Sequence, residues 1–422
     1  MKGLKAGLSE VVITPPVGVR LSGYADRTGP STGILDELYA KALVLDNGER
    51  RLALVVCDVL GLSRSICEAI RDRVQGRTGI DGSDVLVAAT HTHCGPDIDR
   101  LPEASLDHLV AQAGGAVWAA SRSLREANLG FGEGTCLAGV SRRNPRSPRV
   151  PYHLYSYPQG TMDPRVLVMT VRGAQGERLG AVVNYPCHPV TLGWEEMNLS
   201  KDFVEYTCAV LKGAWGPDAV PIFLQGCAAN VNPRWVYDKP DADPILPPDW
   251  PQALEDRLRE TRRLGHLLGG EALKAAETNT RYEAAVVLDA RRVEVELPAR
   301  SDLDLSDDAE ESRPAGRYPG LRNRLRAQPR GFTTEVQVLR MGDAFLIGLP
   351  GEVFVEYQIE LRETLAGHRV FVSELAGDSI GYLPTPAAVI EGGYEPTATY
   401  AVPEAGAALV QAALRAAREM VR

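Results

Sequence analysis

The chain has 422 residues, 44% of them apolar and 24% charged, a balance typical of a globular protein with a large core. Its net charge of -9 and the absence of a basic stripe argue against a nucleic-acid partner. No apolar stretch reaches the ~20 residues of a membrane-spanning helix, and the N terminus has no signal-peptide core, so we expect no transmembrane segment. Seven scattered cysteines favour reduced thiols and a cytoplasmic location.

Apolar runs typical of strands alternate with helical stretches along the chain, which predicts an α/β fold. The predicted strands are 52–57, 85–90, 166–171, 180–185, 220–224, 334–339 and 344–349. The predicted helices are 64–76, 104–126, 202–214, 251–278, 352–366 and 404–421. We expect a single domain, 1–422, of mixed β-sheets packed with flanking helices, with two closely packed lobes as the alternative. The segments 233–251 and 301–331, rich in proline or charge, are predicted surface insertions.

Two histidines one residue apart follow the apolar run 85–90, and Gly95-Pro96 stops the run. Because side chains alternate along a strand, His91 and His93 are expected on one face, where two imidazoles can converge on one ion or substrate. A pair of structural histidines is the alternative, because this spacing alone is a weak signal.

A third histidine, His188, also ends an apolar run, 180–185. Alone it is compatible with an ordinary buried histidine beside a turn, but beside His91 it favours a metal site at strand ends. The other histidines lack this setting and are interpreted as structural or solvated: His108, His153, His266 and His368.

Anionic groups follow further apolar runs. Glu352 comes after a Pro-Gly turn at the expected start of a helix, where a favourable interaction with the helix dipole is an alternative role. Tyr382 and Tyr394 lie in the glycine-rich region beyond it. A tyrosine there can be packing, but beside a divalent cation a phenol can bind the ion or donate a proton to a developing charge.

Two aspartates are candidates to orient the imidazoles from behind. Asp58 ends the strand 52–57, and Asp202 precedes an apolar helix, where capping that helix is the alternative role. Cys94 and Cys187 adjoin the histidines. They are either further ligands, since thiolate suits zinc, or small residues that pack beside the site.

Short motifs along nearly the whole chain match one enzyme family in its own order. They are Ile13-Thr14-Pro15-Pro16, Gly23-Tyr24-Ala25, Leu38-Tyr39-Ala40-Lys41-Ala42, Cys57-Asp58, Ala89-Thr90-His91-Thr92-His93-Cys94-Gly95-Pro96, Asn184-Tyr185-Pro186-Cys187-His188-Pro189, Gln225-Gly226-Cys227, Pro350-Gly351-Glu352 and Ile380-Gly381-Tyr382. Through them the chain resembles the catalytic domain of the neutral/alkaline, non-lysosomal ceramidases, zinc-dependent amidases that cleave N-acyl sphingosine.

The resemblance implies a zinc ion with four ligands: His91, His188, Glu352 and Tyr382. It places His93 beside the metal as a substrate-binding or proton-transfer residue. It also implies that Arg143 and Tyr394 contact the substrate, with Arg142 as the immediate competitor for the role of Arg143.

The departures from the family pattern bear on the chemistry. Where the ceramidases carry a serine in an Asn-x-Ser-Pro segment, this chain has Asn232. An asparagine cannot act as an alkoxide, but its amide can orient a water or donate a hydrogen bond to an oxyanion. An aspartate that precedes Ile13-Thr14-Pro15 in the ceramidases is missing. Because the sequence ends at Arg422, we expect the family's separate immunoglobulin-like domain to be missing as well.

The sequence therefore predicts a zinc-dependent hydrolase that cleaves the C–N amide bond of an N-acyl substrate by metal-activated water. The alternatives are a metal hydrolase of a lactone, ester or short peptide, and a catalytically silent zinc-binding or ligand-binding relative. The expected partner is a small molecule, and the oligomeric state is not predicted.

Overall fold

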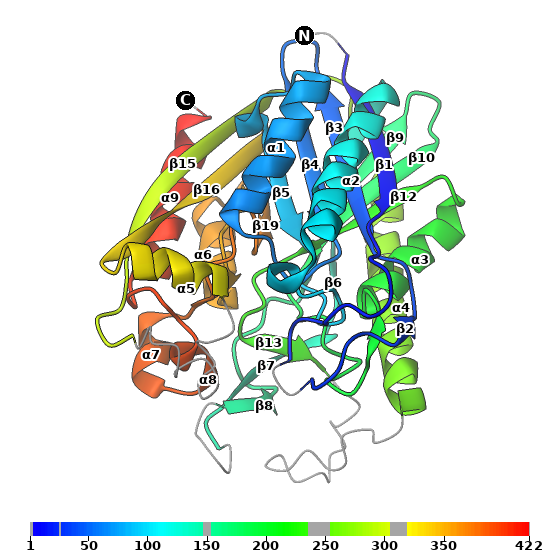
Figure 1. The fold of residues 1–422 in the computed structure, drawn as a ribbon. Coiled ribbons are helices and arrows are strands. Elements are labelled where there is room, and N and C mark those ends of the chain that lie inside the picture. Colours follow the sequence, from blue (N-terminus) through cyan, green and yellow to red (C-terminus); the bar gives the residue numbers. More distant parts are fainter. Residues whose placement is uncertain (1–2, 25–26, 147–152, 235–253, 304–318, 422) are drawn as a thin grey trace.

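Two β-sheets lie face to face and helices cover their outer faces (Figure 1). The computed structural model describes residues 3–24, 27–146, 153–234, 254–303 and 319–421. The sheets are mixed and packed with helices, so the predicted α/β class is confirmed. Among the helices of these ranges, none combines the length and the apolar character needed to cross a membrane.

The larger sheet contains the strands that lead to the histidines. β4 runs parallel to β5, and β10 runs parallel to β12, whereas the other neighbours are antiparallel. β5 is buried along its whole length, as expected for an apolar strand covered on both faces. The order across the sheet is β12 (Val220–Gln225), β10 (Arg178–Tyr185), β9 (Arg165–Gly173), β6 (Arg125–Thr135), β1 (Lys5–Val12), β3 (Tyr39–Asp46), β4 (Arg51–Cys57) and β5 (Val85–Ala89), with β14 (Tyr282–Glu283) paired to β6.

The smaller sheet is formed by the C-terminal part of the chain. Its order is β15 (Leu288–Pro298), β16 (Gly331–Met341), β17 (Ala344–Gly348) and β19 (Arg369–Ser373). β17 and β19 are parallel and are joined through α6 (Val355–Thr364), the kind of crossover that parallel neighbours require.

Apolar side chains from both sheets fill the space between them, among them Leu54, Leu86, Met169, Leu346 and Phe371. On the outer face of the larger sheet, α1 (Arg64–Thr78) and α2 (Glu103–Arg122) cover one half, and α3 (Phe203–Trp215) and α4 (Leu254–Thr278) cover the other. α6 and α9 (Ala405–Glu419) cover the outer face of the smaller sheet. The layers therefore run helix, sheet, sheet, helix (Figure 1).

The short elements lie outside the two large sheets. A small sheet contains β13 (Val231–Pro233), β7 (Gly139–Asn144) and β8 (His153–Tyr157). The remaining elements are β2 (Gly33–Ile34), β11 (Asn198–Leu199), β18 (Glu352–Val353), β20 (Tyr382–Leu383), α5 (Pro319–Ala327), α7 (Pro386–Glu391), α8 (Tyr394–Thr397) and the 3-10 turns Gly82–Asp84 and Ile98–Arg100.

The predicted strands and helices are present, with shifts of a few residues at their ends. One boundary was wrong in a way that matters: the helix expected from residue 352 begins at Val355, and Glu352 lies in β18, so the glutamate does not occupy a helix N terminus. Of the two predicted insertions, residues 235–251 of the first and 304–318 of the second lie outside the described residues.

Candidate metal centre

Three of the predicted ligands, together with His93, lie at strand ends of both sheets. His91 and His93 follow β5, and His188 follows β10, in the larger sheet. Glu352 follows β17 of the smaller sheet. The face-to-face packing therefore brings residues that are far apart in sequence to one place, where all four side chains are buried.

Four donor atoms of these side chains converge. The Nε2 atom of His91 lies 3.0 Å from that of His188 and 3.3 Å from that of His93. The Glu352 Oε2 atom lies 3.4 Å from His91 Nε2 and 3.3 Å from His188 Nε2. Donors around a tetrahedral zinc ion, each about 2.0–2.1 Å from the metal, are roughly 3.3 Å apart. Three imidazoles and a carboxylate at these separations fit a divalent metal ion.

Two of the imidazoles are fixed in the state that metal binding needs. His91 Nδ1 donates to the Leu60 carbonyl at 2.8 Å, and His188 Nδ1 donates to the Ala228 carbonyl at 2.6 Å. A carbonyl oxygen can only accept, so the proton of each neutral ring lies on Nδ1. The lone pair on each Nε2 atom is then directed at the centre.

His91 reaches the site through an unusual backbone conformation. β5 ends at Ala89, and His91 has a φ of 65°, so the expected strand alternation is not what brings His91 and His93 together. A left-handed conformation costs a non-glycine residue roughly 1–2 kcal/mol. It is held here by two bonds, from the His91 amide to Val59 and from its ring to Leu60.

The N-terminal part of the chain packs against His93. The Tyr24 ring meets the His93 ring edge-on at 4.9 Å, and Arg27 donates to the His93 carbonyl. Gly23 has a φ of 93°, and a Cβ atom there would lie 2.5 Å from His93 Nδ1. That nitrogen is buried and has no hydrogen-bond partner among the described residues, in contrast to Nδ1 of His91 and His188.

The charges suit a cation. Burial alone would raise the pKa of the Glu352 carboxyl, but His91 and His188 hold it well below its usual value. Burial, and then the charge of Arg142, lowers the pKa of His188 to about 4. Burial and the two neighbouring imidazoles hold the pKa of His93 well below its usual range. In the metal-free protein at neutral pH, the centre thus presents an anionic carboxylate and at least two neutral imidazoles.

Tyr382 lies beside Glu352, because β18 and β20 pair in parallel with these two residues opposite each other. Its hydroxyl accepts a hydrogen bond from Arg142 Nη2 at 3.2 Å and is hydrogen-bonded to Glu352. Burial and the Glu352 charge hold the pKa of Tyr382 well above its usual value. Its ring lies 5.5 Å from the ring of Tyr394, so both predicted tyrosines border the centre.

Known proteins resemble this chain in sequence and in fold. A sequence model of the neutral/alkaline non-lysosomal ceramidases, N-terminal part, matches residues 5–218, half of the chain. The chain belongs to this ceramidase family. The neutral ceramidase of Pseudomonas aeruginosa is 25% identical over 261 residues, which span 57% of this chain and 38% of that relative.

Solved ceramidase structures share the fold of the whole chain. The crystal structure of the neutral ceramidase from Pseudomonas aeruginosa has a TM-score of 0.81 and 20% identity, and the match covers all of this chain and 75% of the other. A ceramidase solved in complex with C2 has a TM-score of 0.78, 20% identity and coverage of 100% and 76%.

Two consecutive arginines are buried in this ceramidase-family chain, in β7, where all six residues are buried. Arg142 points to the metal centre, where it donates to Tyr382, and its Nε donates to the buried Glu395 at 2.9 Å. Arg143 donates to the other oxygen of Glu395 at 2.8 Å. Arg142 therefore touches the predicted ligand set through Tyr382.

The remaining contacts of Arg143 go to the segment that carries Tyr394. Its Nη2 donates to the Gly392 carbonyl at 2.9 Å and to Glu391 at 3.0 Å, both at the end of α7. Arg143 thus anchors the α7–α8 segment. Contact of Arg143 with a substrate stays a prediction.

Asn232, at the family's serine position, also contacts Arg142. The Arg142 Nη1 atom donates to its side chain at 3.3 Å. A guanidinium has no acceptor, so the Asn232 atom that faces it is the carbonyl oxygen, and the amide nitrogen points elsewhere. Asn232 thus keeps both of its N–H groups for another partner.

The two predicted supporting aspartates bond elsewhere. Asp202 is the N-cap of α3: it accepts from the amide of Phe203 at 2.7 Å and from that of Leu192 at 2.9 Å, which matches the alternative role considered above. Asp58 accepts from the Tyr39 amide at 2.9 Å. Among the described contacts, the Nδ1 atoms of His91 and His188 face backbone carbonyls instead of carboxylates.

Sequence reasoning missed Glu374, which is fully buried next to the centre. It accepts a hydrogen bond from the Val353 amide at 2.8 Å. Burial raises the pKa of Glu374 to about 8; the charge of Glu352 also raises this pKa, and His91 lowers it. Glu374 follows the apolar strand β19, so the criterion that selected Glu352, a carboxylate after an apolar run, also selects Glu374. All seven cysteines, including Cys94 and Cys187, are buried free thiols.

Proposed function

We propose that this protein is a zinc-dependent hydrolase that cleaves the amide bond of an N-acyl substrate of the ceramide type. The observation that carries the proposal is the convergence of three imidazoles and one carboxylate, with His91 and His188 held as Nδ1–H tautomers. Membership of the ceramidase family supports the hydrolase class. The lipid-like substrate, the identity of the metal and a cytosolic location are part of the proposal.

A bound zinc ion supplies hydroxide at neutral pH and polarises the scissile carbonyl. The residues that would hold it are His91, His188 and Glu352, with Tyr382 as the fourth ligand that the resemblance implies. His93 borders the same space with a neutral ring, and we assign to it the transfer of a proton to the leaving amine.

In the proposed reaction, Tyr382, Tyr394 and Asn232 stabilise the carbonyl oxygen as it gains negative charge. Arg142 donates to both Tyr382 and Asn232, so it fixes the directions of a hydroxyl and an amide at once. Such preoriented donors stabilise an oxyanion because they need little reorganisation during the reaction. The serine of the family pattern is replaced, so we propose direct attack by water, without an acyl-enzyme.

The proposal is tested by incubating the metal-loaded protein with a panel of N-acyl amines of increasing acyl length, together with lactones, esters and short peptides. Mass spectrometry of the products identifies which bond breaks. We expect a free acid and a free amine from the N-acyl substrates, and no turnover by His91→Ala. Cleavage restricted to lactones, esters or peptides would contradict the amide assignment.

Asn232 is the observation that favours a second candidate, a metal-binding relative without hydrolytic activity. That candidate predicts bound metal and no turnover of any panel member. Family ceramidases assayed in parallel provide the positive control for the substrates.

A further inference from the structure

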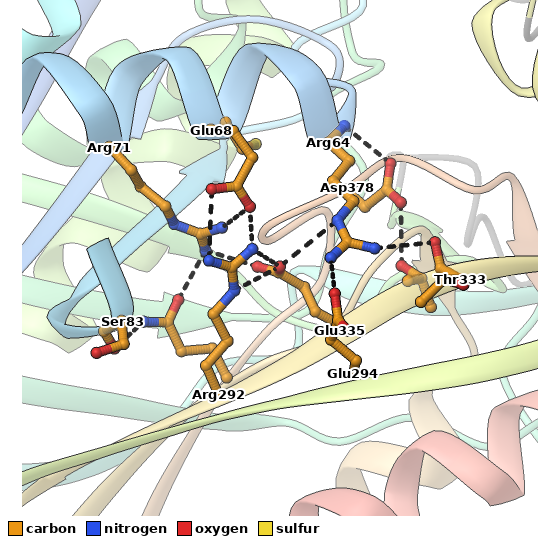
Figure 2. A network of polar contacts seen from close by, with 12 residues as sticks. Arg64, Glu68, Arg71, Ser83, Arg292, Glu294, Thr333, Glu335 and Asp378 are labelled. Atoms are coloured by element: carbon orange, nitrogen blue, oxygen red, sulfur yellow. Dashed lines mark hydrogen bonds and ion pairs between the residues drawn. The ribbon is translucent and has the colours of Figure 1, made fainter. Parts of the chain in front are cut away.

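A buried aspartate outside the proposed ligand set connects several parts of the centre. Asp378 lies between β19 and β20, and its carboxylate is fully buried. It accepts from the backbone amide of Arg64 at 3.0 Å and from the Thr334 hydroxyl at 3.0 Å. The Arg324 guanidinium donates to both of its oxygens, at 3.1 and 2.9 Å, and balances its charge. Figure 2 shows Asp378 next to the start of α1.

Asp378 takes over the capping of α1. The side chain of the N-cap residue Ser63 bonds the Ser65 hydroxyl and makes no cap bond to the helix backbone, and the first turn of α1 holds no acidic residue. A carboxylate that accepts from an amide at a helix N terminus is stabilising, since it pairs an otherwise unsatisfied donor and interacts favourably with the helix dipole. Here the carboxylate comes from 314 residues further along the chain.

The capped end of α1 is continuous with the backbone that holds His91. The carbonyls of Val59 and Leu60 accept from the His91 amide and ring. Gly61 lies directly on the Asp378 segment: a Cβ atom there would be 3.0 Å from the Ser379 hydroxyl. Fixing Arg64 therefore fixes the two carbonyls that hold His91 in its left-handed conformation.

The backbone of the same segment holds the other side of the centre. The Asp378 carbonyl accepts from the Gly351 amide at 3.3 Å, and the Gly381 carbonyl accepts from the Glu352 amide at 2.9 Å. Tyr382 follows directly and pairs with Glu352 across β18 and β20. A shift of Asp378 would thus move Glu352 and Tyr382 together.

We propose that Asp378 is a positioning residue for the metal centre. It fixes the position of His91, on one side of the centre, relative to Glu352 and Tyr382 on the other side. The inference rests on the proposed metal site. Residues behind the ligands of a metal usually change its affinity about 10- to 100-fold when they are replaced. Asp378 reaches these residues through backbone and is expected to have an effect in that range.

The test is the affinity of metal-free protein for Co²⁺ and Zn²⁺, measured by competition with a chromophoric chelator under conditions where each variant is folded. Asp378→Asn keeps the shape of the side chain but sets an amide against Arg324 and Thr334. Thr334→Val is a milder variant that removes one bond to Asp378, in case Asp378→Asn fails to fold. The visible spectrum of bound Co²⁺ is the second readout, because it reports the arrangement of the ligands.

The matched control is Glu68→Gln. Glu68 bonds Arg71 within α1 and Arg292 across the same interface between α1 and the smaller sheet, as Figure 2 shows. Its described contacts do not include the segment 374–382. The variant therefore loses ion pairs of this network while the backbone of the centre is left in place.

We expect Asp378→Asn to lower both metal affinities about 10- to 100-fold and to change the Co²⁺ spectrum. Thr334→Val should lower the affinities severalfold. Glu68→Gln should match the wild type in both readouts. If Asp378→Asn and Thr334→Val bind metal as the wild type does, Asp378 is merely structural and the inference is wrong. If the wild-type protein binds neither metal, the proposed function itself fails, which is a different result.

Discussion

The Nε2 atoms of His91 and His188 lie 3.0 Å apart, although 97 residues separate them in the sequence. Each ring is held from behind by a backbone carbonyl, so two nitrogen lone pairs face each other in a buried space. Two buried acceptor nitrogens that face each other without a partner are unfavourable. A metal ion between the two nitrogens would bind both lone pairs.

Replacement of Gly23 tests the packing behind His93. A Cβ atom at Gly23 would lie 2.5 Å from His93 Nδ1, so Gly23→Ala must displace the ring. We expect kcat to fall at least about 10-fold, since a misplacement near 1 Å can cost a factor of 100. Gly18→Ala is the matched control, because Gly18 also has a positive φ of 105° but nothing within 4 Å of its added atom. Equal kcat values for the two variants would contradict a role for this packing.

Lysine variants separate the two arginines of β7. A lysine ammonium cannot span Tyr382, Asn232 and Glu395 as the Arg142 guanidinium does. We expect Arg142→Lys to lower kcat about 10- to 100-fold with little change in KM. Arg143→Lys should mainly lower stability, by about 1–3 kcal/mol, through its lost bonds to α7. Steady-state kinetics and thermal unfolding, measured on both variants, distinguish the roles of the two arginines. If Arg143→Lys lowered kcat and Arg142→Lys lowered only stability, Arg143 would be the arginine that contacts the substrate.

The stability of the metal-free protein should depend on pH through Glu374. Burial raises its folded pKa from 4.5 to about 8, so between these values the folded protein holds a proton that the unfolded chain releases. The contribution of Glu374 to the free energy of unfolding is therefore greatest below pH 4.5. It declines toward pH 8, by at most about 1.4 kcal/mol per pH unit. Glu374→Gln should remove that part of the slope in urea unfolding at pH 5.5, 6.5 and 7.5. Parallel curves for the two proteins would show that Glu374 does not titrate in this range.

Asn232 should act as a hydrogen-bond donor. Loss of one oxyanion donor typically lowers kcat about 100- to 1,000-fold, so we expect Asn232→Ala to have an effect at the lower end of that range while its metal content is unchanged. Pre-steady-state kinetics of the wild type should show no burst of amine, because no acyl-enzyme accumulates. A burst would require a nucleophile that the proposal does not contain.

The sequence predicted the strand ends that carry the site better than the way in which the site is assembled. The apolar runs before His91, His188 and Glu352 are strands because their buried side chains fit between layers. The order of the strands, and thus the meeting of two sheets, depends on long-range pairing that a local pattern does not contain.

Local exceptions account for most of the other differences. His91 leaves the extended conformation, which strand alternation does not anticipate, and β7 is buried along its whole length, so that both Arg142 and Arg143 are buried. Asp202 caps a helix, as an aspartate in that position commonly does. The contacts of Asp378 join segments 314 residues apart, and its sequence neighbours carry no signal for them.

The most direct test of the central claim is the metal content of the purified protein, measured by elemental analysis after exposure to stoichiometric zinc and removal of loosely bound ions. The account predicts about one zinc ion per chain in the wild type, and a large loss in His188→Ala, because a zinc site of this type needs its protein ligands together. A wild-type protein that retains no metal after reconstitution would contradict the account and leave His91, His93 and His188 as a buried cluster without an ion.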